Sequence, residues 1–103
     1  MRKTASSQTT TPIHPGEILL EEFLKASTPP VSQVEAASRM RIPIVRLNQL
    51  IRGHRGVTPD TAWRLAELTG TTAQFWLNLQ NRYDLWIAEH RARLGKSRSF
   101  RPS

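Results

Sequence analysis

Residues 32–52 constrain the fold of this chain more than any other stretch, because they describe a helix, a tight turn and a second helix. Ser32 and Glu35 form a capping box, in which the Ser32 hydroxyl accepts from the Glu35 backbone N–H and the carboxylate reaches back to the Ser32 N–H. The small residues Ala36 and Ala37 let a second helix approach closely. Apolar residues fall where two short crossed helices need a shared core, at Val34, Ala37, Met40, Ile42, Leu47 and Leu50.

The other face of the predicted second helix is polar and basic, with two apolar residues exposed at its start. Amide and guanidinium groups match the hydrogen-bonding edges of base pairs, so such a face suits the major groove of DNA better than plain solvent. The residues of this face are Ile44, Val45, Arg46, Asn48, Gln49 and Arg52.

The charge of the chain also favours a polyanionic partner. Fifteen Lys and Arg residues against eight Asp and Glu give a formal net charge of +7, and the pI is near 11.3. Two blocks hold basic residues and no acid, namely residues 39–55 with five arginines and residues 91–103 with five Lys and Arg. We assign the first block to nucleic acid because it overlaps the predicted recognition helix. For the second block, nucleic-acid binding and a solvated, solubilising face both stay open.

The composition excludes several classes of protein. The chain has no cysteine, so it can build neither a disulfide framework nor a thiolate metal site. No apolar run reaches the length of a membrane span or of a signal-peptide core. We therefore expect a soluble, cytoplasmic protein with no membrane partner.

An enzymatic function finds little support in the motifs. The three histidines, His14, His54 and His90, lack metal-ligand spacing, and the chain has neither a nucleophile elbow nor a phosphate-cradling glycine loop. We expect no catalytic site, no metal and no cofactor. His14 stands beside a helix start and His54 in a basic turn, which favours structural or DNA-contact roles for both.

Capping and turn signals predict three more helices. Pro15 suits the first position of a helix that ends at Thr28-Pro29-Pro30. Thr58-Pro59-Asp60 opens another helix, which runs to a C-capping Gly70, and a capping box that opens at Thr71 begins the last one. The predicted fold class is therefore all-α, with five helices.

We divide the chain into an arm, a domain and a tail. Residues 1–11 form a flexible N-terminal arm, because they offer too little apolar surface to offset the entropy of ordering them. Residues 12–91 form the DNA-binding domain, which ends in an aromatic helix. Residues 92–103 form a basic C-terminal tail.

The aromatic helix carries more apolar residues than one surface against a domain core would use. Aromatic anchors are enriched in protein–protein interfaces, so we predict a dimer interface made of Trp76, Leu79, Tyr83, Trp86 and Ile87. Alternatively, a small domain spends its aromatic residues on its own core. That interpretation is the better one for Phe75 and Leu79.

Several separate motifs connect this chain to a known family. They are His14-Pro15-Gly16-Glu17-Ile18-Leu19, the run from Gly53-His54-Arg55-Gly56 to Thr61-Ala62, Phe75-Trp76-Leu77-Asn78-Leu79-Gln80, and Tyr83-Asp84-Leu85. Residues 33–50 have the spacing of the phage-repressor-like (Xre/Cro) helix-turn-helix. Over residues 13–90, with the motifs in the right order, the chain resembles the HigA antitoxin family, also called VapI or plasmid-maintenance antidote proteins.

Two positions depart from the family pattern. Arg41 stands where the turn usually has a glycine, so either Arg41 adopts a left-handed conformation or the turn has a different shape. Pro43 stands where Ser or Thr usually caps the recognition helix, and proline cannot accept the capping hydrogen bond.

The resemblance implies two partners. HigA-like proteins bind and silence HigB, a small basic toxin related to the RelE ribonucleases, and repress the operon that encodes both. We therefore expect a bacterial, nucleoid-associated antitoxin that binds a HigB-type toxin and operator DNA. The alternatives are a free-standing helix-turn-helix repressor without a toxin, and an adaptor whose Arg41 and Pro43 have disabled DNA binding.

The polar residues of the predicted DNA surface match particular groups on DNA. Asn48 and Gln49 match adenine, and Arg46 or Arg52 can pair with guanine or hold phosphate. Arg55 and the backbone N–H groups that open the helix after Thr58 can hold the sugar-phosphate chain. One unit reads too few base pairs to find a site in a genome, so we predict a homodimer on a palindromic operator. The full set of predicted DNA contacts is Gln33, Pro43, Ile44, Val45, Arg46, Asn48, Gln49, Arg52, Arg55 and Thr58.

Overall fold

A computed structural model describes residues 11–95, and every regular element within them is a helix. In chain order the elements are α1 (Pro15–Ile18), the π-helix η2 (Leu19–Leu24), α2 (Gln33–Met40), α3 (Ile44–Ile51), α4 (Pro59–Thr69) and α5 (Ala73–Gly95). Because η2 continues α1 without a break, the two make one first helix, and the predicted all-α, five-helix fold is confirmed. The predicted arm up to residue 10 and the tail from residue 96 lie outside the described residues.

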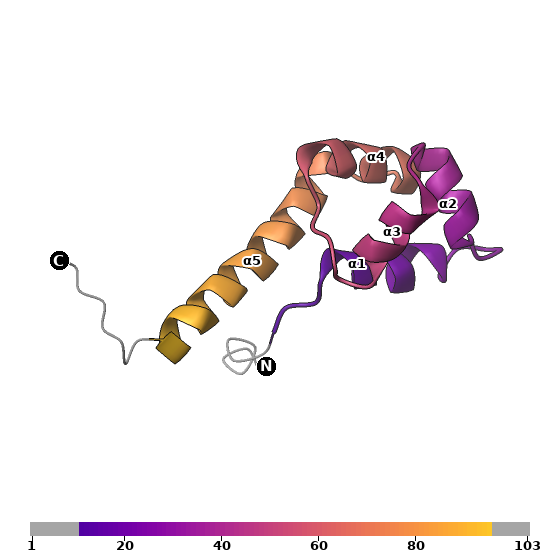
Figure 1. The fold of residues 1–103 in the computed structure, drawn as a ribbon. Helices are drawn as coiled ribbons and strands as arrows, with labels where there is room; N and C mark the ends of the chain where they lie inside the picture. Colours follow the sequence, from indigo (N-terminus) through magenta and orange to yellow (C-terminus); the bar gives the residue numbers. More distant parts are fainter. Residues whose placement is uncertain (1–10, 96–103) are drawn as a thin grey trace, which may run out of the picture.

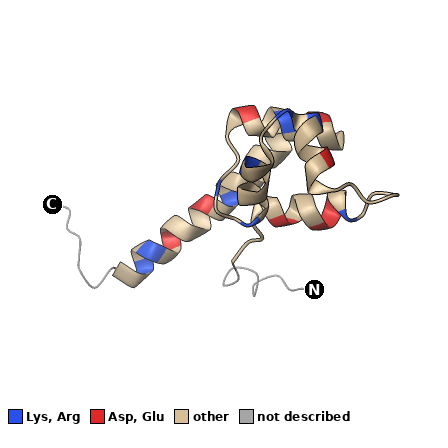
Figure 2. Cartoon of the chain, turned by 45° about the vertical axis from the view of Figure 1, so that its right-hand side comes forward, with Lys and Arg blue, Asp and Glu red and all other residues tan. Residues whose placement is uncertain are grey.

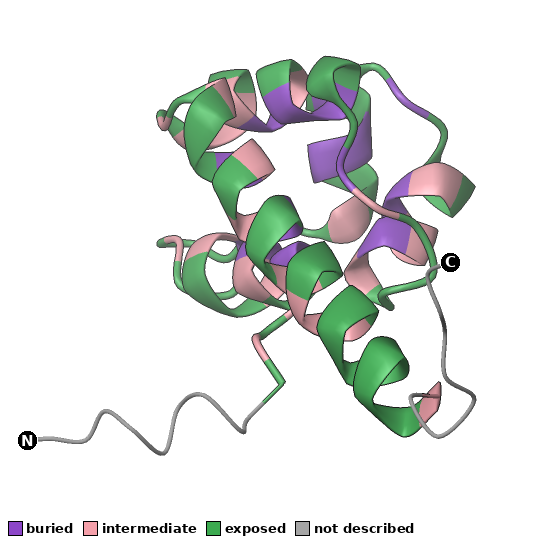
Figure 3. Cartoon of the chain, turned by 90° about the vertical axis from the view of Figure 1, so that its left-hand side faces the viewer, coloured by how far each residue is buried: buried purple, intermediate pink, exposed green. Residues whose placement is uncertain are grey.

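The short helices form a bundle from which α5 extends (Figure 1). The N-terminal part of α5 packs against α4 and α1, and its C-terminal part runs away from the bundle. Exposed residues dominate this outer part (Figure 3). The helix continues past residue 91, where we placed the end of the domain, and ends at Gly95.

The first helix begins with a cap that was only partly predicted. Pro15 occupies the first helical position as expected. The preceding residue, His14, caps the helix, because its ring nitrogen Nδ1 accepts a hydrogen bond from the Gly16 backbone N–H at 2.9 Å. A cap of this kind satisfies one of the backbone donors that every helix start leaves unpaired. His14 therefore has the structural role that its position favoured.

The turn between α2 and α3 keeps the expected shape despite its two unusual residues. Ser32 caps α2 as predicted, with its hydroxyl accepting from the Glu35 N–H at 3.0 Å, while the Glu35 carboxylate pairs with Arg39. Arg41 adopts the left-handed conformation, with φ 59° and ψ 45°, which is the first of the two predicted outcomes. Pro43 is the N-cap of α3 and supplies no side-chain hydrogen bond, also as predicted.

One tryptophan from α5 closes the core. Trp76 is fully buried and lies 5.5 Å from Phe23, measured between ring centroids. Of the core residues predicted in α2 and α3, Val34 alone is wrong. It is 69% exposed, because it projects about 110° around α2 from the centre of the buried stripe. The buried apolar residues are Leu19, Leu24, Ala36, Ala37, Met40, Ile42, Leu47, Leu50, Val57, Ala62, Leu65 and Trp76.

The start of α5 differs from the prediction. Thr58 caps α4 and Gly70 ends it with φ 76°, both as expected. However, Thr72 and not Thr71 caps α5, since the Thr72 hydroxyl accepts from the backbone N–H three residues later at 3.1 Å. The Thr71 hydroxyl instead accepts from the indole N–H of Trp76 at 2.8 Å. A buried indole needs such a partner, so the burial of Trp76 decides which threonine caps the helix.

Acidic and basic residues are interspersed over much of the surface (Figure 2), and several form ion pairs, such as Lys25 with Glu21 and Arg64 with Asp60. The exposed acids Glu17, Glu21 and Glu22 lie on α1 and η2, whereas arginines gather on α2, α3 and the turn after α3. Within residues 11–95, no helix is both long and apolar enough to cross a membrane. In the same residues, no group of three or more His, Asp or Glu side chains could hold a metal ion.

Candidate nucleic-acid interface

The start of α3 is an exposed part of the predicted DNA surface. Pro43 is exposed, and Ile44 and Val45 are 42% and 61% exposed. Leu47 and Leu50 anchor the opposite side of α3 in the core, so this face of the helix points outward. Apolar groups in this position can pack against the methyl groups of thymine.

Asn48 is held in place by α2. Its Nδ2 donates to the Oε1 atom of Gln33 at 3.3 Å, and both residues are half-buried. The hydrogen bond brings Gln33, the first residue of α2, beside the recognition helix, as its assignment to the DNA surface requires. An amide that is already oriented loses less conformational entropy when it binds a base edge.

Gln49 and Arg55 form a pair that connects α3 to the turn after it. The Arg55 guanidinium donates to the Gln49 Oε1 atom from Nε at 3.2 Å and from Nη2 at 2.8 Å. The turn itself begins with Gly53, whose φ of 79° lets the chain leave α3 sharply. The structure therefore places a predicted base reader and a predicted phosphate contact side by side.

Arg46 points toward α4 and not into solvent. Its Nη2 atom donates to the Thr61 hydroxyl at 2.9 Å and lies 3.4 Å from the Asp60 carboxylate. A hydrogen bond from Arg64 lowers the pKa of Asp60 below its ordinary value, and Arg46 adds to this effect. Arg46 Nε is buried and has no hydrogen-bond partner within the described residues. In this arrangement the side chain fastens α3 to α4.

Arg52 and Thr58 stand on either side of the basic turn. Arg52 is the C-cap residue of α3, and its exposed side chain forms no ion pair with an acid in the part of the chain described. Thr58 uses its hydroxyl to cap α4, so its side chain orders the helix start. A helix N-terminus attracts phosphate, which makes the backbone here a suitable phosphate contact.

The predicted dimer surface on α5 needs one correction. Trp76 is fully buried inside a single chain and has no surface left for a partner. Leu79, Tyr83, Trp86 and Ile87 are half-buried. Two apolar residues outside the predicted dimer set, Leu85 and Leu94, are 61% and 71% exposed along the outer part of α5. Phe75, for which the core was the better interpretation, is 37% exposed.

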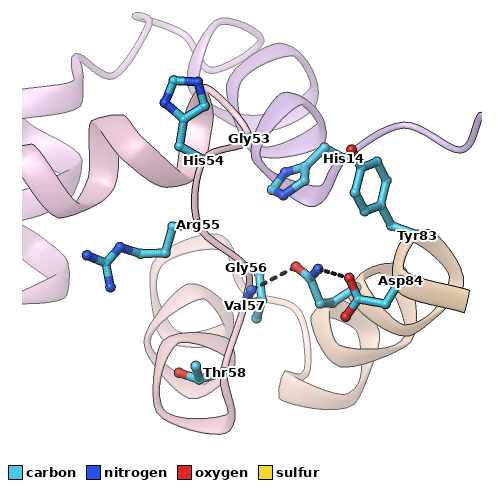
Figure 4. A pocket seen from close by; sticks show the side chains of 10 residues that line it. His14, Gly53, His54, Arg55, Gly56, Val57, Thr58, Tyr83 and Asp84 are labelled. Atoms are coloured by element: carbon cyan, nitrogen blue, oxygen red, sulfur yellow. Dashed lines mark hydrogen bonds between the residues drawn. The ribbon is translucent and has the colours of Figure 1, made fainter. Parts of the chain in front are cut away.

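A pocket of about 380 Å³ lies where α1, the turn after α3 and α5 meet (Figure 4). His14 packs edge-on against Tyr83 there, with ring centroids 4.9 Å apart. Gln80 reaches from α5 to the turn, accepting from the Val57 backbone N–H at 2.7 Å. Gln80 was not predicted as a functional residue, although it belongs to one of the motifs shared with the HigA family.

Comparisons with known proteins agree with this geometry. A family model described as helix-turn-helix matches residues 31–76. Virulence-associated protein I of Dichelobacter nodosus is 47% identical over 77 residues, which cover 75% of this chain and 69% of that protein.

Two solved structures extend the likeness to the whole fold. One is an addiction module antidote protein of a HigA family from Coxiella burnetii, with 39% identity and a TM-score of 0.76 over 91% of this chain and 100% of that one. Another is the Pseudomonas aeruginosa antitoxin HigA with the higBA promoter, with 36% identity and a TM-score of 0.77 over 88% and 97% of the two chains. The chain belongs to the HigA family of Xre-type helix-turn-helix antitoxins, which are DNA-binding regulators and not enzymes.

Proposed function

We propose that this protein is an antitoxin that represses its own operon by sequence-specific binding in the major groove and neutralises a RelE-like ribonuclease toxin of the HigB type. In this proposal α3 enters the groove, and the turn after it holds the sugar-phosphate chain. The protein then works in the bacterial cytoplasm, where its operator keeps it at the nucleoid.

One observation carries the DNA-binding part of the proposal. The outward face of α3 presents two amides, and each is already held by a hydrogen bond to a neighbouring element: Asn48 to Gln33, and Gln49 to Arg55. Exposed apolar residues lie at the tip of the same helix. This is the chemistry of base-edge recognition, and it lies within the arginine-rich part of the surface. A similar protein has been solved with the higBA promoter.

The proposal is tested by fluorescence anisotropy with the promoter upstream of the gene and with a scrambled duplex, each at two salt concentrations. We expect tighter binding to the promoter at both, and a fall in affinity with salt that reports the number of phosphate contacts. Asn48→Ala or Gln49→Ala should reduce the preference for the promoter. Equal affinity of the unmodified protein for both duplexes would contradict sequence-specific binding.

Arg55→Ala serves as the matched variant for the phosphate contact. It should weaken binding to both duplexes by a similar factor and reduce the slope of the salt dependence by about one for each chain bound. A change in which duplex is preferred would show that Arg55 reads a base.

For assembly, we propose a two-fold dimer formed through α5 on a palindromic operator. The support is the set of apolar residues on the outer part of α5, among them Leu85 and Leu94, which a single chain leaves exposed. A footprint across the promoter should show two protected half-sites about one helical turn apart. Protection without two-fold symmetry argues against the dimer.

For the toxin, the test is genetic and biochemical. We expect the neighbouring gene to encode a small basic ribonuclease that copurifies with this protein and loses RNA cleavage when this protein is in excess. A ribonuclease that stays fully active under those conditions removes the antitoxin function. If no such gene is present, the free-standing repressor is the correct alternative.

A further inference from the structure

One buried side chain connects α5 to the predicted phosphate-contact turn. Gln80 is 9% exposed, and both ends of its amide are used. Its Oε1 atom accepts from the Val57 N–H at 2.7 Å, and its Nε2 atom donates to the Asp84 carboxylate at 2.9 Å, as the dashed lines in Figure 4 show. The position of the amide is therefore set from two sides.

The turn lies directly against this amide. A Cβ placed on Gly56 would be 3.2 Å from the side-chain Cδ of Gln80, which is tighter than ordinary contact. At the other end of the turn, Gly53 lies beside the His14 ring, which in turn contacts Tyr83. The helix α5 thus supports the turn at both ends, directly through Gln80 and through His14.

The turn carries the groups that we assign to phosphate. Arg55 points away from α5 toward α3, where Gln49 receives its guanidinium (Figure 4). Thr58 follows at once as the cap of α4, so Val57 is joined directly to the α4 N-terminus. A displacement of Val57 would move both groups relative to α3.

We propose that Gln80 is a positioning residue for DNA binding. By fixing Val57, it holds the turn 53–58 so that Arg55 and the α4 N-terminus meet the phosphate chain while α3 occupies the groove. This inference rests on the proposed function. Its physical basis is preorganisation, because a turn that is already ordered loses less entropy when it closes on the DNA backbone.

The first test is Gln80→Met, which keeps the length of the side chain and removes both hydrogen bonds. Binding to the promoter duplex is measured by anisotropy across a range of salt concentrations. We expect about a two- to tenfold loss of affinity, the size expected for the loss of one hydrogen bond between neutral groups, here the one that holds Val57. We also expect a smaller salt slope, since fewer phosphates are contacted.

A charge-swapped pair separates positioning from general damage. Gln80→Glu alone keeps an acceptor for the Val57 N–H but places two carboxylates together, so the repulsion from Asp84 should displace the side chain and weaken binding relative to the unmodified protein. Gln80→Glu combined with Asp84→Asn restores both hydrogen bonds, because the introduced carboxylate accepts from the Val57 N–H and from the introduced amide. The double variant should recover the affinity and salt slope of the unmodified protein.

Thr71→Val is the control for stability. It removes the hydrogen bond to the Trp76 indole, where α5 begins, without touching the turn. At a temperature where all variants are folded, its promoter affinity should equal that of the unmodified protein. If Thr71→Val binds as weakly as Gln80→Met, or if the double variant stays weak while folded, Gln80 does not position the turn.

Binding of the unmodified protein and of Gln80→Met distinguishes failure of the proposed function from failure of the role of Gln80. If the unmodified protein binds no duplex at low salt, the proposed function falls, and this inference falls with it. If the unmodified protein binds its promoter and Gln80→Met binds it with the same affinity and salt slope, only the role of Gln80 is wrong.

Discussion

Gly16 of α1 lies against the backbone of Leu50 in α3, so closely that a Cβ on Gly16 would be 1.9 Å from the Leu50 carbonyl oxygen. Both sides of this contact are main chain, so no side chain can move away to make room. Gly16→Ala should therefore separate the first helix from the recognition helix and destabilise the protein by about 3 kcal/mol. Urea unfolding followed by circular dichroism measures this, with Gly95→Ala as the control because an added Cβ there meets nothing within 4 Å. A Gly16→Ala variant as stable as the control would show that the two helices separate easily.

Arg41 is held in a left-handed conformation that glycine adopts without steric cost. Arg41→Gly should raise the free energy of unfolding by about 0.5–1 kcal/mol, because the relief of strain exceeds the extra entropy that glycine gives the unfolded chain. The matched variant Arg39→Gly, inside α2, should lower it by about 1 kcal/mol. The two variants should therefore change the free energy of unfolding in opposite directions. A loss of stability in both variants would contradict this prediction.

His14 should make stability depend on pH. Burial lowers the pKa of His14 below its ordinary value, although Asp84 opposes the effect, so the folded chain favours the neutral ring whose Nδ1 caps α1. As the pH falls below the ordinary value of 6.5, the unfolded chain takes up a proton that the folded chain does not. The stability contributed by the neutral ring is therefore complete above that pH and is lost as the pH falls toward the lowered pKa.

Urea midpoints at pH 7.5 and 5.5 test this expectation. His14→Asn keeps a capping oxygen and cannot titrate, so it should reduce the difference between the two midpoints. His54→Asn, which removes an exposed histidine from the turn, serves as the control and should keep the difference. If the midpoints of His14→Asn differ as much between pH 7.5 and pH 5.5 as those of the unmodified protein, the pH dependence of stability comes from another group.

Arg46 in α3 and Arg52 at its C-cap should have different roles, Arg46 in stability and Arg52 in DNA binding. Arg46→Ala removes the hydrogen bond to Thr61 and the ion pair with Asp60, so it should lower the free energy of unfolding by about 1–2 kcal/mol. Arg52→Ala should leave stability within about 0.5 kcal/mol and reduce the salt slope of promoter binding. Thermal unfolding and anisotropy, measured on both variants, distinguish the two roles. Equal losses of stability would show that Arg52 also fastens α3.

Most features that depend on neighbouring residues in the sequence were predicted well, the cap of α5 being an exception. The caps at Ser32 and Thr58, the left-handed Gly70 and the helix start at Pro15 follow from local hydrogen bonding and backbone preference. The same local reasoning left two outcomes open for Arg41, and the structure has the strained one. Capping and turn residues determine where each helix begins and ends, and therefore most of the fold.

Features that depend on how helices cross were predicted poorly. The partner of Arg46 lies fourteen or fifteen positions away on α4, and nothing in the sequence near Arg46 indicates it. Trp76 was assigned to an interface because a helical projection shows which residues share a face but not which neighbour covers that face. The role of Gln80 needs contact across 23 positions, so only the shared motif in which it stands could have drawn attention to it.

The burial of Trp76 has a consequence for how this protein can change over generations. The indole that completes the hydrophobic interior of the DNA-reading half is supplied by α5, the helix that also carries the exposed apolar surface. A segment cut before Trp76 and grafted elsewhere would carry an unfilled hole. Any transfer of α3 to another protein therefore has to keep α5 with it, whereas exposed residues of α3 can be exchanged without disturbing this shared interior.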